Sequence, residues 1–286
     1  MTIALSLKVN DGVVLAADSA TSLITRHQDG STGVINIYNN ANKIFNLRKG
    51  LPIGACTWGS GSIGVASIST LLKDLRRRFA GQDPAYHDWS LNKDSYTVEH
   101  VAQRLADYVF GELYVPAFAD WPEKPALGFI VAGYSADSGM AEEYQIDILN
   151  GQLAGPRQLR PANDSGLTWS GEPEAINRVV LGFGSALPAV LQNNLGIPPE
   201  QIATVVSILR QHLTAPLVMA AMPIQDAIDL AHFLVELTVN FSRFAPGAPT
   251  VGGPIEIAAI TKHEGFKWVT RKHYFTSTLN PPEPQP

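Results

Sequence analysis

The chain has 286 residues, of which 45 % are hydrophobic and 16 % charged, with a net charge of −5 and a pI of about 5.8. This composition is typical of a globular protein with a substantial core and excludes a disordered or fibrous chain. It provides no basic field for nucleic acid or anionic lipid. The N-terminus lacks the basic region of a signal peptide, and no apolar run reaches the roughly 18 residues of a membrane span. We therefore expect a soluble, cytoplasmic protein with no nucleic-acid or membrane partner.

The first strands are predicted in two pairs, and Asp11-Gly12 favours a tight hairpin in the first pair. A polar excursion, about residues 19–40, separates the pairs. From Gly59 the apolar spacing becomes helical and predicts a helix to about Phe79. The predicted strands are Ile3–Val9, Val13–Ala17, Asn42–Leu47 and Leu51–Thr57.

Further along, an exposed polar loop is expected over Ala80–Ser95, and Arg76-Arg77-Arg78 before it indicate a solvated helix face. A second helix over Thr97–Tyr114 ends at the Pro-rich stretch Val115–Pro125. In the last predicted helix one apolar stripe runs from Ile224 to Phe241. The remaining predicted strands are Ala126–Tyr134, Glu142–Ile148, Gln152–Pro156, Ile255–Thr261 and Lys267–Thr270, and the remaining helices are Pro173–Gly182, Pro198–Thr214 and Ile224–Phe244.

This order of hairpins and helices favours stacked layers over βαβ winding. Two antiparallel sheets packed face to face, with helices on both outer faces, accommodate it as an α+β, four-layer αββα sandwich. No linker and no repeat is found. We expect a single domain over residues 1–286, with a Pro-rich tail from about residue 279 that is frayed at Pro281–Pro286.

Thr2 follows the initiator methionine, and a small residue at this place normally lets Met1 be removed. A terminal threonine carries a hydroxyl nucleophile and a free α-amine on one residue. That amine, with a pKa of about 7.7–8.0, can act as a base near neutral pH. The threonine–N-terminus pair is a known variant of triad catalysis. The start of the chain is therefore a candidate active site.

Three segments resemble proteasome β-type subunits, which belong to the N-terminal-nucleophile hydrolases and share an αββα sandwich. They are Thr2, the run Asp11–Ser19 and Asn42-Lys43-Ile44-Phe45. The resemblance continues at the central hairpin, Phe129–Gly133 and Tyr144–Ile148, and at the late strand Gly252–Ile257, but it is specific only in the first sixty or so residues. Because bacteria carry standalone relatives, such as the Anbu-type ancestral β subunits, the chain is more similar to a bacterial homologue than to a core proteasome subunit.

The resemblance implies a role for each matching residue. Thr2 would be the nucleophile with its α-amine as base, and Asp18 would orient the catalytic Lys43. The Gly59 N–H would stabilise the oxyanion, and Ser170 would assist the terminal amine. The resemblance also implies a peptide or protein substrate and a homo-oligomer of one or more rings, and it leaves an unfoldase partner open. No cofactor or metal is expected.

Two departures from the family pattern concern the tuning of the terminal amine and the substrate cleft, which the segment of residues 19–40 would border. The loop Ala248–Gly253 lacks the Asp and Ser that the family places near the terminal amine, and the segment of residues 19–40 is longer than usual. Substrate preference therefore does not transfer from the family. Two alternatives to a peptidase also stay open, namely a catalytically inactive scaffold or binding subunit and an acylase of the same superfamily that acts on a small amide.

Several motifs have a second interpretation. Ser170, followed by acids, also fits a helix N-cap. The run Gly59–Gly64 matches the dinucleotide fingerprint, but it follows hairpins and lacks the later acid. Cys56 is the only cysteine, which excludes an intrachain disulfide, and its apolar surroundings indicate a buried structural thiol. Neither His232 with Glu236 nor His263-Glu264 forms a zinc signature.

Overall fold

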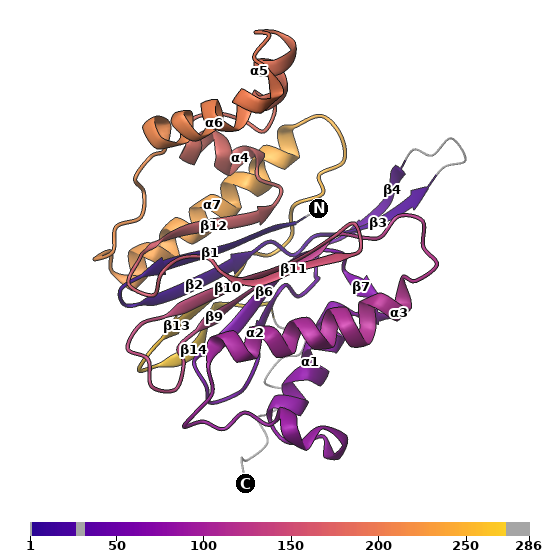
Figure 1. The fold of residues 1–286 in the computed structure, drawn as a ribbon, viewed down its shortest axis with the longest axis vertical. Coiled ribbons are helices and arrows are strands. Elements are labelled where there is room, and N and C mark those ends of the chain that lie inside the picture. The colour runs from indigo at the N-terminus through magenta and orange to yellow at the C-terminus, as the bar shows by residue number, and fades with distance from the viewer. Residues whose placement is uncertain (1, 27–31, 273–286) are drawn as a thin grey trace.

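The computed structural model describes residues 2–26 and 32–272. Its main body consists of four layers in the order helix, sheet, sheet, helix (Figure 1). Each of the two central sheets has five strands, and neighbouring strands are antiparallel. The predicted αββα sandwich is therefore confirmed. The Pro-rich tail lies outside the described residues.

The first sheet has the order β12-β1-β2-β13-β14. Its strands are β1 (Ile3–Val9), β2 (Gly12–Ala17), β12 (Gly166–Gly171), β13 (Glu256–Thr261) and β14 (Gly265–Thr270). Every residue of β1 and β2 is buried because this part of the sheet is covered on both faces. Along β1, Ile3, Leu5 and Leu7 pack toward the outer helices, whereas Ala4 faces the second sheet, as the two-residue period of a strand requires.

The second sheet has the order β11-β10-β9-β6-β5. Its strands are β5 (Ile44–Asn46), β6 (Ile53–Gly59), β9 (Leu127–Gly133), β10 (Glu142–Leu149) and β11 (Gln152–Gln158). Small side chains, including Ala4, Ala17 and Ala132, lie between the two sheets and allow a close approach. Cys56 is fully buried among them, and burial raises the pKa of its thiol to about 12, so it is the structural thiol that the sequence predicts.

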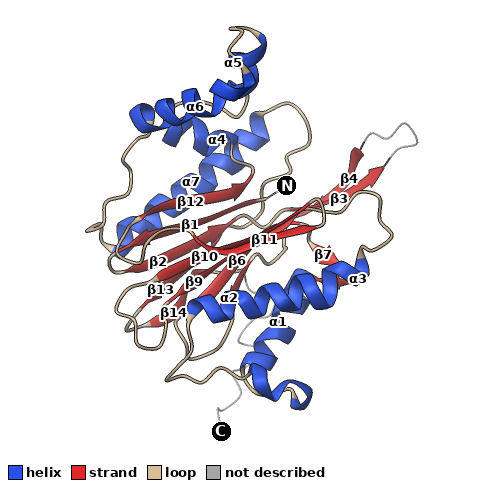
Figure 2. Ribbon diagram, in the orientation of Figure 1, coloured by secondary structure: helices blue, strands red, loops and turns tan. Residues whose placement is uncertain are grey.

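Helices cover the outer face of each sheet (Figure 2). The helices against the first sheet are α4 (Glu174–Ile176), continued by a π-helical stretch (Asn177–Leu181), and α7 (Ile224–Phe244). Helices α5 (Leu187–Asn193) and α6 (Pro199–Leu213) lie beyond α4, away from the sheet (Figure 2). Those beside the second sheet are α1 (Ile68–Phe79), a 3₁₀ helix (Pro84–Trp89), α2 (Val98–Ala106), a π-helical stretch (Asp107–Tyr114) and α3 (Val115–Ala117). Within residues 2–26 and 32–272, no helix is long and apolar enough to cross a bilayer.

The buried face of α7 differs from the prediction at its end. Ala227, Ile228, Ala231 and Leu234 are buried as expected, but Phe241 is 38 % exposed. Val235 and Thr238 take the last buried positions instead. Helix α7 extends beyond the first sheet there, so the stripe loses its partner before the helix ends.

The predicted polar excursion contains a β-hairpin, β3 (Thr21–Arg26) and β4 (Thr32–Tyr38). It projects from the body near the N-terminus of the described chain (Figure 1). The sequence analysis described this segment only as polar and did not predict the hairpin. Val34, Ile35 and Tyr38 are good strand formers, but all three are exposed. A strand that buries little apolar surface has no clear alternation in its sequence.

Helix α1 begins at Ile68, later than the expected start near Gly59. A short hairpin, β7 (Ser62–Ile63) and β8 (Ala66–Ser67), occupies the gap. The Ser67 hydroxyl then caps the helix by accepting a hydrogen bond from the Thr70 amide at 3.2 Å. The glycines at 59, 61 and 64 favour turns over a helix, which explains the late start.

Two other expectations near α1 hold only in part, since most of residues 80–95 and Arg77 are exposed. The loop after it is not simply exposed, because Trp89 and Leu91 are buried in the core. Arg78 is also buried, where it pairs with Glu112 at 2.8 Å and its guanidinium lies over the Tyr86 ring. The apolar surroundings hold the aliphatic part of Arg78 while Glu112 neutralises its charge.

Strand β12 and helix α5 were not predicted.

Candidate active site

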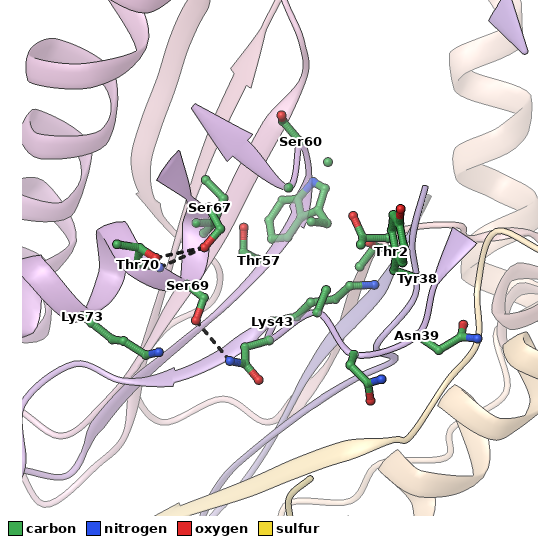
Figure 3. Close-up of a pocket in the computed structure, with 18 residues that line it drawn as sticks. Thr2, Tyr38, Asn39, Lys43, Thr57, Ser60, Ser67, Ser69, Thr70 and Lys73 are labelled. Atoms are coloured by element: carbon green, nitrogen blue, oxygen red, sulfur yellow. Dashed lines mark hydrogen bonds between the residues drawn. The ribbon is translucent and has the colours of Figure 1, made fainter. Parts of the chain in front are cut away.

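Thr2 directly precedes β1 at one wall of a cavity of about 600 Å³ (Figure 3). It is 4 % exposed, and its carbonyl accepts a hydrogen bond from the Glu172 amide at 2.7 Å. This bond fixes the start of β1 against the end of β12. Lys43 and Gly59 line the same cavity, so three of the five predicted site residues meet there. The predicted removal of Met1 concerns a residue outside the described ones.

Asp18 follows β2, which pairs with β1 in a hairpin register that places Ala17 opposite Ala4. Asp18 is fully buried beside the start of β1, where its Oδ1 accepts a hydrogen bond from the Ile3 amide at 3.0 Å. Its Oδ2 accepts from the amides of Ala20 and Gly252, each at 3.0 Å. Three backbone amides thus hold the Asp18 carboxylate beside Ile3, the residue that follows Thr2.

Lys43 lies one residue before β5, and its Nζ is 2.5 Å from Oδ1 of Asp18. Burial lowers the pKa of the Lys43 ammonium, and the neighbouring Asp18 carboxylate opposes this shift. Figure 3 shows the Lys43 side chain directed toward Thr2. The arrangement supplies a positive charge to the cavity wall near the threonine hydroxyl.

Gly59 ends β6, and its amide points toward the cavity side of the strand. Ser60 donates to the Ala126 carbonyl on the β9 side, and Thr57 donates to the Lys43 carbonyl on the opposite side. Because amides alternate along a strand, the Gly59 N–H is directed to the side of Thr57, beyond the start of β5 at Ile44. The geometry suits a donor to a bound oxyanion.

Only glycine fits at position 59. Its φ is +87°, and an added Cβ would lie 2.3 Å from the Ala126 carbonyl oxygen.

Ser170 lies in β12 opposite Ala4, on the face of the sheet that carries Thr2. Among the described residues that line the cavity, however, Ser170 is absent. The alternative interpretation of Ser170 as a helix cap was wrong, because α4 begins after Pro173 and has no side-chain cap. Ser170 is near Thr2 through the strand register but outside the cavity wall.

The loop Ala248–Gly253, which lacks the expected Asp and Ser, contributes its backbone. Gly252 donates its amide to Asp18, and its carbonyl accepts from the Ser19 amide at 2.9 Å. Thr250 and Val251 are buried beside it. The loop therefore holds the Asp18 carboxylate with main-chain groups, which do not depend on the side chains at these positions.

The far walls of the cavity come from the segment of residues 19–40, which the family comparison of the sequence connected with the substrate cleft, and from the start of α1, which it did not. They are residues of the β3–β4 hairpin and its exit and of the start of α1, namely Thr21, Tyr38, Asn39, Ser67, Ser69, Thr70 and Lys73. Among the described residues that line the cavity, none is Asp or Glu. The strand-forming residues of β4 were the sequence signal for the hairpin that lines the cavity. Ser67, a typical N-cap residue, was the signal for the start of α1 beside it.

The other candidate binding motifs of the sequence do not form a site within the described residues. The Gly59–Gly64 run forms the end of β6 and the β7 hairpin, not a strand-to-helix phosphate loop, so the dinucleotide interpretation was wrong. His232 and Glu236 lie 3.8 Å apart as a surface pair. In the described part of the chain, no three His, Cys, Asp or Glu side chains gather where they could hold a metal ion.

No protein-family model matches the chain, and no curated protein matches it. Among solved structures, a Gly-1 mutant of Anbu from Hyphomicrobium sp. strain MC1 is similar over 95 % of this chain and 86 % of that chain, with a TM-score of 0.52 and 14 % identity. The chain shares the Anbu fold. Anbu (ancestral beta-subunit) from Yersinia bercovieri is also similar, with a TM-score of 0.47, 12 % identity, and coverage of 95 % of this chain and 88 % of that one.

Proposed function

We propose that the chain is a threonine-type amidohydrolase that cleaves peptide or amide bonds through Thr2 after removal of Met1. The observation that carries this proposal is the joint placement of Thr2 and Lys43 at one cavity, with Lys43 held by the buried Asp18. The proteasome-like fold, shared with Anbu, supports it. The sequence supplies the residue types, and the cavity supplies the room for a substrate.

In this mechanism the Thr2 hydroxyl attacks the carbonyl carbon of the substrate while its proton passes to the terminal amine. The carbonyl oxygen becomes an oxyanion that accepts a hydrogen bond from Gly59. The C–N bond then breaks, and the leaving amine takes the proton from the terminal ammonium. Water, activated by the same amine, attacks the ester and releases Thr2. The Lys43 ammonium stabilises the alkoxide that develops on Thr2.

Intact-mass spectrometry with a peptide epoxyketone tests the proposal, because this reagent needs both the hydroxyl and the free amine of a terminal threonine. The expected result is loss of Met1 and one adduct per chain, with no adduct on Thr2→Ala. Thr2→Ser keeps a hydroxyl and is expected to react. Protein from its native host that retains Met1 and forms no adduct would overturn the proposal and favour the inactive scaffold.

The size of the substrate needs a separate comparison. A panel of fluorogenic peptides and a panel of small acylated amines, each assayed with wild type and Thr2→Ala, distinguishes a peptidase from a small-amide acylase. We expect Thr2-dependent hydrolysis of the peptides.

We also propose that the subunit assembles with copies of itself. Support comes from α6, none of whose residues is buried, and from the half-exposed apolar side chains of Ile208 and Leu213 on it. Native mass spectrometry tests this by counting chains per particle. A single chain at micromolar concentration would overturn it.

A further inference from the structure

A second buried ion pair lies behind the Asp18–Lys43 pair. Nζ of Lys272 is 3.0 Å from Oε2 of Glu256, and both side chains are almost completely buried. Glu256 is the first residue of β13, and Lys272 lies two residues past the end of β14. An ion pair that is removed from water needs further partners to offset its desolvation.

Those partners connect Lys272 to the candidate active site. Its Nζ donates to the Ser19 hydroxyl and to the Ala41 carbonyl, each at 2.7 Å. Ser19 follows Asp18 in the chain, and Ala41 precedes Lys43 by two residues. One ammonium thus contacts both segments that carry the Asp18–Lys43 pair.

The two segments are also joined to each other and to the late strand. The Ala41 amide donates to the Ser19 carbonyl at 2.9 Å. The Ser19 hydroxyl, in turn, donates to the Pro254 carbonyl at 2.6 Å. Lys272 occupies the centre of this junction, where no other described cation reaches Ser19 or Ala41.

We propose that Lys272 and Glu256 form a positioning pair, in which Lys272 sets the spacing between the Asp18 and Lys43 segments and Glu256 holds Lys272 in place. This inference rests on the proposed function, since it assigns a role in the site of Thr2. Neither residue touches the cavity, so both act through Asp18 and Lys43.

The pair also acts on Lys43 through its charges. After burial, the largest influence on the pKa of Lys43 is Asp18, followed by Lys272, which lowers it, and Glu256, which raises it. Lys73 lies on the far wall of the same cavity. Removal of Lys272 therefore favours the charged form of Lys43, and removal of the Glu256 charge disfavours it.

Titration of the Lys43 side chain by ¹⁵Nζ NMR, with the signal assigned through Lys43→Arg, tests the electrostatic part. We expect Lys272→Met to raise the pH at the titration midpoint of the Lys43 ammonium and Glu256→Gln to lower it. Lys267→Met, on the exposed face of β14, serves as the matched control and should leave it unchanged. Shifts in the same direction for both variants, or none, would overturn this part. The readout does not need hydrolysis, so it is separate from a failure of Thr2 to react.

The positioning part is tested by the rate of epoxyketone trapping together with urea unfolding. We expect Lys272→Met to slow trapping at least tenfold, within the range known for small displacements of catalytic groups, and Lys272→Arg to restore part of the rate. Lys272→Met also leaves the Glu256 carboxylate without its ion-pair partner, which lowers the stability of the fold. The double variant Lys272→Met/Glu256→Met removes both charges and should regain stability while trapping stays slow. Recovery of the full rate together with stability would overturn the positioning role.

Discussion

Oδ1 of Asp18 lies 2.5 Å from Nζ of Lys43 and 3.0 Å from the amide nitrogen of Ile3, the residue that follows Thr2. One carboxylate oxygen therefore joins the start of β1 to the segment before β5. The other oxygen accepts two more backbone amides. The Asp18 side chain therefore ties the Lys43 charge directly to the segment that carries Thr2.

Asp18→Asn is expected to reduce epoxyketone trapping by roughly 10²-fold or more, because Lys43 loses the charge that orients it. It should also lower the free energy of unfolding by about 3–5 kcal/mol, the usual cost of breaking a buried ion pair. Trapping rates and urea unfolding measure the two effects. Asp11→Asn, at the exposed turn of the same hairpin, is the control and should change neither by much. A normal trapping rate in Asp18→Asn would contradict the role of Asp18.

Gly59→Ala should reduce both stability and trapping. Its Cβ would lie 2.3 Å from the Ala126 carbonyl oxygen, so β6 must shift at the point where the Gly59 amide faces the cavity. Gly64→Ala is a matched control, since Gly64 also has a positive φ (+57°) but has nothing within 4 Å of an added Cβ. Each variant places a side chain on a residue with positive φ, which costs about 1–3 kcal/mol. Only Gly59→Ala also displaces the Gly59 amide. Equal trapping rates for the two variants would argue against Gly59 as the oxyanion donor.

Lys73 on α1 should influence which substrates are cleaved. It lines a cavity whose described walls hold no carboxylate, and the other lysine there, Lys43, is paired with Asp18. We expect wild type to prefer a fluorogenic peptide with an acidic side chain next to the cleaved bond over its lysine counterpart. Lys73→Glu should reverse this preference, mainly through KM, whereas Lys93→Glu on an exposed loop should not. An unchanged preference in Lys73→Glu would show that the side chain next to the cleaved bond does not reach Lys73.

Glu143 on β10 gives a prediction on pH. It is fully buried between the sheets, 2.6 Å from the Ser6 hydroxyl and 3.3 Å from a guanidinium nitrogen of Arg160. Burial raises the pKa of its carboxyl above 4.5, and Arg160 only partly opposes the shift. The native state therefore binds this proton more tightly than the unfolded state, so the stabilisation from Glu143 is complete below about pH 4 and is lost as pH rises through the raised pKa.

Urea unfolding of wild type and Glu143→Gln from pH 4 to pH 8 checks this expectation. The stability of wild type relative to Glu143→Gln should fall with pH, by at most about 1.4 kcal/mol per pH unit, and then level off. Glu200→Gln, on the exposed face of α6, measures the effect of losing a surface carboxylate. A relative stability that rises with pH would mean that the ion pair with Arg160 outweighs the burial of Glu143.

The β1–β2 hairpin illustrates what the sequence could predict. Asp11-Gly12 and the apolar runs around it specify a local turn and register, and that register alone brings Asp18 back beside Ile3. The same local signals located most strands and the long helix α7. They failed at β3–β4 and β12, where polar or glycine-rich strands show little alternation, and at α1, where glycines delay the start of the helix.

By itself, the sequence determined the order of strands and helices that favours αββα layers, the threonine next to Met1 and the hairpin that carries Asp18, because each depends on residues close together in the chain. The family resemblance implied that Asp18 orients Lys43 and that residues 19–40 border the cleft. Only the tertiary structure decided that this segment folds as the β3–β4 hairpin, that α1 forms a further wall, and that Lys272 joins Ser19 to Ala41. These contacts join segments far apart in the chain. Their geometry is set by how the sheets and helices pack, which no short stretch of sequence specifies.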